Sequence, residues 1–431
     1  MERTSRRRRP GFPEPAKECE AARLLRDDKP DNKSKADKSN IWGEIGMKRF
    51  ELIAVLAAST VCSAAHAEDS VTIGVHASFS GAGAAFAEGM LAATNFAAED
   101  VNKDGGLEVA GKRYKVLIKQ YDDRYRAQDA VTAMDRLITQ DGIRFVVGPM
   151  GSAAAVATKD QTTSGKVITM TLAFTPRALG ADAPYAYRPV ITTGEFSDPQ
   201  VAWLMKNTAA KQVVSLLPND ETGQQIGVAN FNSYAKTGAK LQVEYFERER
   251  VDFVPILTRI LMKADGLELG GNSPTTAGLI LKQARELGYK GPVFVTGGDV
   301  AAEMLKVAGK DAAEGVYVHL PIDTGLPDTA AYVARFKAKY GPNMNGFSPF
   351  FYAGLQMLFT AMKKAGTVDD TTKIATTLDG LSDVPTAMGK AGWTGEQKYG
   401  IKHQIDLPFY VGQFKDGVVA KVATCDVNAC K

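Results

Sequence analysis

From residue 71 onwards, short apolar runs rich in β-branched residues alternate with stretches whose apolar residues recur every three or four positions. Runs of the first kind are typical of buried strands, and the longer spacing is typical of amphipathic helices. Eight runs before Pro321 predict strands: Val71–Ala77, Lys115–Tyr121, Phe145–Gly148, Val167–Ala173, Val213–Pro218, Leu241–Phe246, Val293–Thr296 and Val316–Leu320. The alternation predicts an α/β fold with mostly parallel sheets flanked by helices, and the 364 residues after Ala67 suit two such domains.

Two of the predicted helices carry boundary signals. Apolar residues recur at helical spacing from Phe86 to Val101, and the pattern ends in the polar and glycine residues 102–106. Further on, Ser273 can cap a helix whose first turn contains Pro274 and which Gly288 can end. In open α/β sheets of the kind predicted, ligands bind beyond the carboxyl ends of the strands.

After Pro321 the pattern becomes mainly helical, over 329–340, 347–365 and 371–378. It returns to strand at 409–414 and 418–422, and the Asp416-Gly417 pair between these runs is a hairpin signal. No segment of the chain repeats another.

Composition narrows the class of protein. Of the 431 residues, 45% are hydrophobic and 23% are charged, values near the average for globular proteins, which excludes a mainly disordered chain, collagen, a coiled coil or a polytopic membrane protein. The net charge is +3, but residues 68–431 contain 38 basic and 39 acidic side chains. The one dense basic run is Arg6–Arg9, so we expect no nucleic-acid partner.

The first 67 residues resemble a leader. Met47-Lys48-Arg49 precedes an apolar run of 11 residues and then Ala65-His66-Ala67, which predicts a secretory signal peptide over 47–67, cleaved after Ala67, and a periplasmic location. The run is too short to span a bilayer, which needs about 20 residues. Residues 1–46 are predicted to be a disordered or untranslated extension. Alternatives are a lipoprotein cysteine at Cys62 and a twin-arginine signal at Ser5–Arg7, although no apolar segment follows the latter closely.

Few residues offer metal or disulfide chemistry. Cys425 and Cys430 are the two cysteines left after residue 67, and they can close a small loop in an oxidising compartment. We expect no metal site, since His76, His319 and His403 form no ligand-spaced pair and are interpreted as structural or surface histidines. Carboxylates such as Asp122-Asp123 and Glu247 with Glu249 are interpreted as solvated.

Two loops could bind an anion. The stretch from Ser80 to Phe86 follows a strand and opens a helix as a dinucleotide-binding turn does, but Phe86 stands where that turn needs a small residue. A loop that shapes the mouth of a pocket is the alternative. The second loop joins the strand ending at Gly148 to Ser152 and the predicted helix Ala153–Gln161, where backbone N–H groups and the Ser152 hydroxyl could hold a carboxylate. The alternative is that Ser152 only caps the helix. The sequence around Ser152, residues 150–154, lacks the second glycine of a nucleophile elbow, so we do not expect a catalytic serine there.

Several short segments, in this order and spacing, resemble the type I periplasmic binding proteins, specifically the leucine/isoleucine/valine-binding branch of ABC-transporter receptors. The segments are Ile73-Gly74 with Ser80-Gly81, Asn102–Gly106, Asp122-Asp123, Val146–Pro149, Asp252-Phe253, Lys282–Gly288 and Ala313–Val316. The resemblance implies two α/β lobes joined by a hinge with the ligand between them. Lobe 1 would comprise residues 70–192 and 321–395, and lobe 2 residues 193–320 and 396–422, followed by a tail over 423–431.

The resemblance also implies ligand-binding residues. The ligand carboxylate would be held at Ser152, with Ala153 in the same helix start, and in the loop Ala173–Pro176, which includes Thr175. The ligand amine would meet the carbonyl of Ala173 and the acid Asp299, and Phe86 would pack on the ligand side chain. Two departures from the family pattern are Phe174 and Thr222. Phe174 in place of a hydroxyl residue favours an aromatic or less polar acid, and the alternative is that Thr175 supplies the hydroxyl and the ligand is a branched-chain amino acid.

The predicted function is therefore that of a periplasmic solute-binding receptor of an ABC importer, which closes its hinge on a small carboxylate-bearing ligand. Its partners would be that ligand and the permease subunits of the inner membrane, and we expect a monomer without catalytic activity or cofactor. A ligand sensor with the same fold is the alternative, and an NAD-dependent dehydrogenase is a remote one.

Overall fold

Strand β1 (Ser70–Ala77) is buried along nearly its whole length in the computed structural model, which describes residues 69–341 and 344–431. Burial on both faces is expected of the central strand of a parallel sheet covered by helices. β1 pairs in parallel with β3 and β4, in a six-stranded sheet ordered β2-β3-β1-β4-β5-β6. The other strands are β2 (Leu107–Val109), β3 (Lys112–Asp122), β4 (Phe145–Met150), β5 (Ile168–Leu172) and β6 (Ala186–Tyr187).

The second sheet has seven strands in the order β16-β15-β11-β10-β9-β7-β8. Its strands are β7 (Gln212–Pro218), β8 (Lys240–Phe246), β9 (Gly266–Glu268), β10 (Val293–Val295), β11 (Tyr317–Leu320), β15 (Phe409–Lys415) and β16 (Val418–Cys425). The pairs from β8 to β11 are parallel, whereas β15 and β16 run antiparallel. A small third sheet contains β12 (Val384–Thr386), β13 (Gly389–Thr394) and β14 (Gln404–Asp406).

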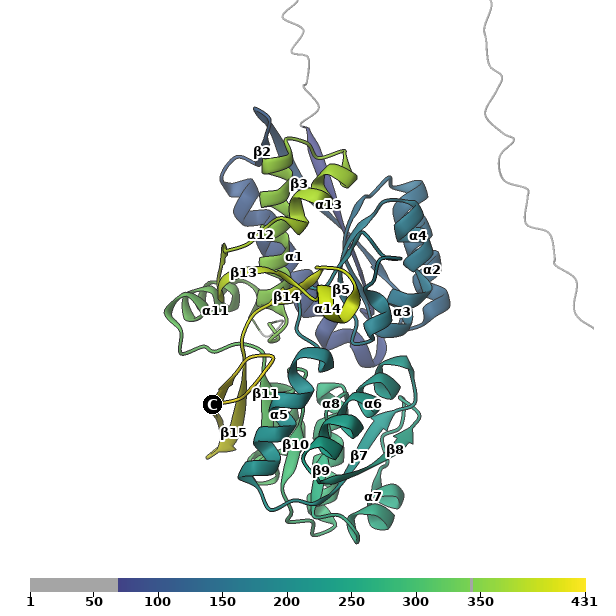
Figure 1. Ribbon diagram of the computed structural model, residues 1–431, viewed down its shortest axis with the longest axis vertical. Helices are drawn as coiled ribbons and strands as arrows, with labels where there is room; N and C mark the ends of the chain where they lie inside the picture. Colours follow the sequence, from purple (N-terminus) through teal and green to yellow (C-terminus); the bar gives the residue numbers. More distant parts are fainter. Residues whose placement is uncertain (1–68, 342–343) are drawn as a thin grey trace, which may run out of the picture. The chain divides into compact units, whose positions relative to one another are not determined.

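Helices cover both faces of each large sheet, so that the chain forms two lobes within one compact unit (Figure 1). The first lobe contains α1 (Ala84–Lys103), α2 (Ala127–Asp135), α3 (Ser152–Ala157), α4 (Lys159–Ser164), α11 (Pro327–Tyr340), α12 (Ser348–Ala365) and α13 (Thr371–Asp379). The second contains α5 (Thr193–Asn207), α6 (Glu221–Lys236), α7 (Val254–Leu261), α8 (Pro274–Glu286), α9 (Ala301–Ala308) and α10 (Lys310–Ala313). Short α14 (Glu396–Tyr399) lies beside the third sheet.

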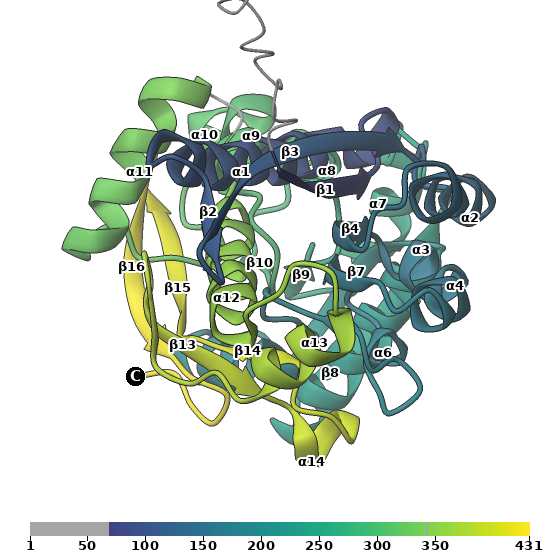
Figure 2. The same cartoon turned by 90° about the horizontal axis from the view of Figure 1, so that it is seen from above.

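An aromatic cluster attaches the C-terminal helices to the first lobe. The ring of Phe96 in α1 lies 5.5 Å from Phe336 in α11 and 5.5 Å from Tyr352 in α12, centroid to centroid. Each large apolar side chain buried in this way contributes about 1.5–3 kcal/mol. Helices α1 and α12, far apart in sequence, therefore lie side by side, as both views show (Figure 2).

The predicted α/β architecture is confirmed. All ten predicted strands are present, and so are the helices predicted around Phe86–Val101, after Ser273 and over 329–340, 347–365 and 371–378. The predicted helix Ala153–Gln161 is two helices, α3 and α4. The hairpin is confirmed as well, because Lys415 pairs with Val418 and both Asp416 and Gly417 have positive φ.

The predicted division of the chain between the lobes remains a prediction. β14, which it assigns to lobe 2, pairs with β13 in the small sheet, and Gln404 forms a bridge to Arg188 at the end of the first sheet. The predicted signal peptide, its cleavage after Ala67 and the extension over 1–46 lie outside the described residues.

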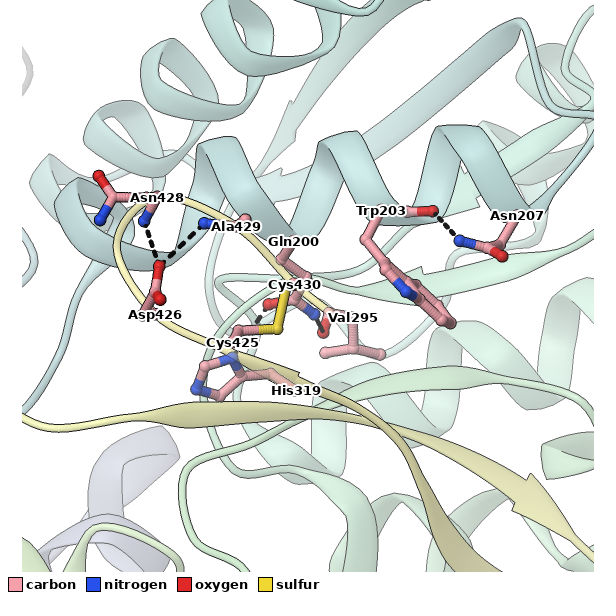
Figure 3. Close-up of a disulfide and its surroundings, with 10 residues drawn as sticks. All are labelled: Gln200, Trp203, Asn207, Val295, His319, Cys425, Asp426, Asn428, Ala429 and Cys430. Atoms are coloured by element: carbon pink, nitrogen blue, oxygen red, sulfur yellow. Dashed lines mark hydrogen bonds between the residues drawn. A yellow bond between two sulfur atoms is a disulfide. The ribbon is translucent and has the colours of Figure 1, made fainter.

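A disulfide joins Cys425 at the end of β16 to Cys430 (Figure 3). Between the two cysteines, Asp426 accepts the backbone N–H groups of Asn428 and Ala429, at 2.7 and 3.0 Å. Gln200 of α5 lies beside the disulfide in the same view, and Trp203 lies further along that helix. The C-terminal loop is thus held against the second lobe.

Candidate functional site

A cavity of about 590 Å³, including the space at its mouth, lies where the carboxyl ends of strands from both sheets meet. Met150 and Leu172 end β4 and β5 of the first lobe, while Gly271 and Gly298 follow β9 and β10 of the second. In the first sheet β1 lies between β3 and β4, and in the second sheet β7 lies between β9 and β8. The strand order therefore reverses at β1 and at β7. Open α/β sheets bind ligands at this position.

Four aromatic side chains form much of the cavity wall. Phe86 of α1 and Phe347, just before α12, lie 5.6 Å apart between ring centroids at an angle of 56°. Phe174 follows β5 and packs edge-on against Phe196, and Tyr125 follows β3. The aliphatic side chains of Met150, Leu172 and Ile226 complete an apolar lining.

The loop from Ser80 to Phe86 shapes this cavity, as the pocket-mouth alternative expects. Gly83 and Phe86 both line it at the start of α1. A Cβ atom at Gly83 would lie 2.5 Å from the terminal methyl group of Met150 and 2.9 Å from Ser78 Cβ, so a larger residue there would require these side chains to shift. The loop thereby brings the α1 backbone close to β4.

The buried carboxylate of Asp123 fixes the position of Tyr125. Tyr125 lies in a tight turn with φ of 59°, and its backbone N–H donates to Asp123 Oδ1 at 2.9 Å. Asp123 also accepts the Ser78 hydroxyl and contacts His76 Nε2 at 3.2 Å, and none of its side chain is exposed. The expectation of solvated carboxylates is therefore wrong for Asp123, although Asp122 is exposed. Burial raises the pKa of Tyr125, so its phenol stays protonated near neutral pH.

Arg248, in the loop after β8, reaches the cavity from the second lobe. Its Nε donates to Asp220 Oδ2 at 2.5 Å, and its guanidinium carbon lies 4.5 Å from the centre of the Tyr125 ring. Asp220 also caps α6 by accepting the Gly223 N–H at 2.9 Å. The guanidinium is thus held between a carboxylate of its own lobe and an aromatic ring of the other.

A buried carboxylate shapes the second lobe's side of the cavity. Glu268, at the end of β9, accepts the N–H of Gly270 at 2.7 Å and the N–H of Thr296 at 2.9 Å. Its other oxygen accepts the hydroxyls of Thr296 and Tyr234. These bonds fix the loops after β9 and β10, which supply Gly271, Asn272, Ser273 and Gly298 to the lining.

Ser152 and Thr222 meet across the two lobes. The backbone N–H of Ser152 donates to Thr222 Oγ1 at 3.3 Å, and the Thr222 hydroxyl also lies 3.3 Å from that of Tyr125. The Ser152 hydroxyl oxygen accepts the N–H groups of Phe174 and Thr175, both at 3.1 Å, and its side chain is fully buried. Gly151 is the N-cap residue of α3, so Ser152 does not occupy the cap position.

Arg188 holds the loop 173–176, which the family resemblance predicts to bind the ligand carboxylate. Its Nη1 donates to the carbonyl oxygens of Ala173 at 3.1 Å and Thr175 at 3.2 Å, and its Nε donates to Gln404. Thr175 is buried, and its hydroxyl lies 3.4 Å from Glu221 Oε1. The Ala173 carbonyl, predicted to meet a ligand amine, is therefore engaged by Arg188.

Asp299 makes a bond between the lobes. Its Oδ2 accepts the backbone N–H of Gly346, which precedes α12 of the first lobe. Burial raises the pKa of Asp299, and this hydrogen bond opposes the rise. Asp299 is half-buried next to Gly298, which lines the cavity.

Of the predicted site residues, Phe86, Phe174 and Thr222 line the cavity. Ser152 contacts the latter two, and Ala173 and Thr175 flank Phe174 in the chain, while half-buried Ala153 lies in the first turn of α3. Asp299 lies beside the lining, and its carboxylate accepts the backbone N–H of Gly346. The roles assigned to these residues remain predictions.

Three prominent lining residues were not predicted from the sequence: Tyr125, Arg248 and Phe347. Tyr125 follows the Asp122-Asp123 pair, and Arg248 lies between Glu247 and Glu249. Side chains in such charged loops are usually solvated, so neither gave a signal for a cavity. Within 69–341 and 344–431, no group of three or more histidine, cysteine or acidic side chains is arranged to hold a metal ion.

Comparisons with known proteins identify relatives that match most of the described region. A family profile described as periplasmic binding protein matches residues 70–418. The Leu/Ile/Val-binding protein BraC3 of Rhizobium johnstonii is 30% identical over 345 residues, which cover 77% of this chain and 89% of that protein.

Solved structures share the fold. The branched-chain amino acid transporter substrate-binding protein LivJ of Streptococcus pneumoniae, in complex with isoleucine, superposes with a TM-score of 0.72 at 21% identity, covering 83% of this chain and 100% of that one. A solute-binding protein of an ABC transporter from R. palustris, in complex with benzoate, gives a TM-score of 0.71 at 17% identity, covering 84% and 97%.

Proposed function

Because the chain belongs to the periplasmic binding protein family, we propose that it captures a small carboxylate-bearing ligand between its lobes and delivers it to the permease of an ABC importer. One observation carries this proposal: the cavity is lined by both lobes, with Phe86 and Phe174 on one side and Thr222 on the other. A ligand held by both lobes stabilises the closed arrangement, and closure distinguishes a loaded receptor from an empty one.

The lining can provide the affinity that a receptor needs. Micromolar binding corresponds to about −8 kcal/mol. Hydrogen bonds to a charged ligand group contribute about 1.5–3 kcal/mol each, and apolar surface contributes about 25 cal/mol per Å² buried. The proteins named above bind amino acids or benzoate, which share a carboxylate, and a carboxylate ligand is the class that this cavity fits.

Delivery to a permease requires that the receptor lie outside the cytoplasmic membrane. We expect the segment 47–67 to direct secretion and the mature chain to act as a periplasmic monomer. Among the described residues, no helix combines the length and apolar character that crossing a bilayer requires.

The first test identifies the ligand. The mature chain is purified from its native compartment without refolding, and the small molecules released on denaturation are identified by mass spectrometry. We expect a carboxylate-bearing compound that rebinds to the stripped protein in calorimetry. Release of no compound, combined with the absence of binding by any small acid, would refute the proposal.

The second test concerns the partner. Photocrosslinkers placed at exposed positions of both lobes, such as Gln128 and Val228, are expected to label a membrane permease when ligand is present. Labelling of a receptor kinase instead would favour the sensor alternative.

A further inference from the structure

Arg248 is the only charged side chain among the described residues that line the cavity between the lobes. We propose that Arg248 binds the ligand carboxylate and that the ligand is an aromatic monocarboxylic acid without an ammonium group. The inference rests on the proposed function, since it names the class of ligand for the same cavity. Neither the family resemblance nor the sequence pattern assigns a role to this residue.

The surroundings of Arg248 leave donors for a ligand. A guanidinium has five N–H donors in one plane. Asp220 accepts from Nε, and it contacts Nη2 as an ion pair. Nη2 is buried against this carboxylate, whereas Nη1 makes no hydrogen bond to another of the described residues. A carboxylate entering the cavity can accept from the donors that Asp220 does not engage, in the paired geometry that arginine favours.

Asp220 and Tyr125 fix the guanidinium before a ligand arrives. Asp220 is itself fixed, because it caps α6 through the Gly223 N–H. The Tyr125 ring covers one face of the guanidinium at 4.5 Å. A donor group held in place in this way loses little conformational entropy on binding.

Helix termini reinforce the preference for an anion. Three long helices start at the cavity, with Phe86 in the first turn of α1, Thr222 in the first turn of α6 and Ser273 as the N-cap of α8. The positive ends of their dipoles lower the free energy of negative charge there and raise that of positive charge. They act in the same direction as Arg248.

The groups expected to hold an ammonium each already accept a hydrogen bond from the protein. Asp299 Oδ2 accepts the Gly346 N–H, and the Ala173 carbonyl accepts from Arg188. No acidic side chain belongs to the described lining. An ammonium group in the cavity would lose its hydration without an acidic side chain in the lining to pair with, which is costly for a charge.

The remaining lining fits a flat apolar body. The rings of Phe86, Phe174 and Phe347 lie on the first lobe's side, and Ile226 lies opposite on α6. Aromatic rings pack well edge-to-face or offset against such walls. An acid whose body is a single aromatic ring satisfies both the apolar walls and the one cationic group.

Calorimetric titrations of the mature chain, stripped of bound molecules, test the inference. The probes are benzoate, 4-hydroxybenzoate, phenylacetate, the neutral analogue benzamide, and the amino acids leucine and phenylalanine. We expect at least one aromatic acid to bind, benzamide to bind at least tenfold more weakly than benzoate, and both amino acids to bind at least a hundredfold more weakly than the best acid.

Substitutions at Arg248 provide the second arm. Arg248→Gln should weaken binding of the best acid tenfold to a hundredfold, as expected when a charged hydrogen-bond donor is lost, and should change benzamide binding little. Arg250→Gln is the matched control, because Arg250 is exposed two residues away, and should leave all affinities unchanged. Circular dichroism checks folding, and the comparison of benzoate with benzamide in the unaltered chain needs no variant.

Three results would overturn the inference: amino acids that bind as tightly as the aromatic acids, an unchanged affinity for the best acid in Arg248→Gln, or no binding of any aromatic acid. The proposed function would survive the first two, because a receptor for another carboxylate would still carry its ligand and crosslink to a permease. The proposed function itself would fail if the purified chain released no ligand and crosslinked to no permease.

Discussion

His319 lies in the interior of the second lobe, where it stacks on Phe409 at 5.3 Å between ring centroids. Its Nδ1 lies 3.0 Å from Gln200 Oε1, so the neutral ring donates to the amide oxygen. Figure 3 shows that Gln200 in turn lies beside Val295, to whose carbonyl its amide nitrogen donates. Burial lowers the pKa of His319 to about 3.

This low pKa makes stability depend on pH. Between about pH 6.5 and pH 3, the unfolded chain binds a proton at His319 that the folded chain does not, so the free energy of unfolding falls as the pH falls. The loss from this residue is about 1.4 kcal/mol per pH unit. His319→Phe, compared with the unaltered chain in denaturant titrations from pH 7 to pH 4, should show a shallower slope. Equal slopes would contradict this assignment.

At the same scale, sequence analysis identified part of the site. The family resemblance assigned Phe86, Phe174 and Thr222 to the ligand site, and all three line the cavity, although Phe174 and Thr222 depart from the family pattern in residue type. Tyr125 and Arg248 were not predictable, because a carboxylate orients each of them: Asp123 accepts the Tyr125 backbone N–H, and Asp220 accepts from Arg248 Nε. The pattern of apolar and polar positions does not predict these contacts. Burial of a carboxylate such as Asp123 depends on partners distant in sequence.

At the scale of elements, most of the strands that were not predicted are short. β9 is a central strand of the second sheet, but it has three residues and ends in Glu268. An acidic residue at the end of so short a run indicates a loop, and four donors from elsewhere in the fold make its burial tolerable. By contrast, the Asp416-Gly417 hairpin was predictable because both residues favour the positive φ that the turn needs.

The disulfide at the end of β16 is expected to stabilise the second lobe modestly. Cys425 and Cys430 are five residues apart. Closing so small a loop lowers the entropy of the unfolded chain and thereby raises its free energy by about 2 kcal/mol at room temperature. Cys425→Ser combined with Cys430→Ser in the mature chain should lower the free energy of unfolding by that amount. A reductant should have the same effect on the unaltered chain and none on the double variant. If the double variant is as stable as the unaltered chain, the disulfide does not contribute.

At the scale of the whole molecule, hydrogen bonds between the lobes accompany the closed cavity. Asp299 bonds to Gly346 on one side, and Ser152 bonds to Thr222 on the other. Two α/β domains were predictable from the alternation of strands and helices together with the length of the chain. The cross-lobe partners were not, since they are set by how the lobes meet rather than by either lobe alone.

Two substitutions at Asp299 separate closure from ligand recognition. Asp299→Ala removes the acceptor for the Gly346 N–H and should weaken ligand binding about tenfold, the equivalent of one charged hydrogen bond. Asp299→Asn keeps an amide oxygen that can accept the same N–H, so its dissociation constant should stay within about threefold of the unaltered value. If Asp299→Asn weakens binding as much as Asp299→Ala, the carboxylate instead pairs with a ligand ammonium.

The most direct measurement fills the cavity and asks whether binding survives. Thr222 lines the cavity from α6, whereas Val228 on the same helix is 58% exposed. In calorimetric titrations with the compound released from the native protein, Thr222→Trp should abolish binding because its indole occupies the space between the lobes. Val228→Trp should bind like the unaltered chain. Equal affinities for Thr222→Trp and Val228→Trp, with both variants folded, would show that the ligand does not bind between the lobes.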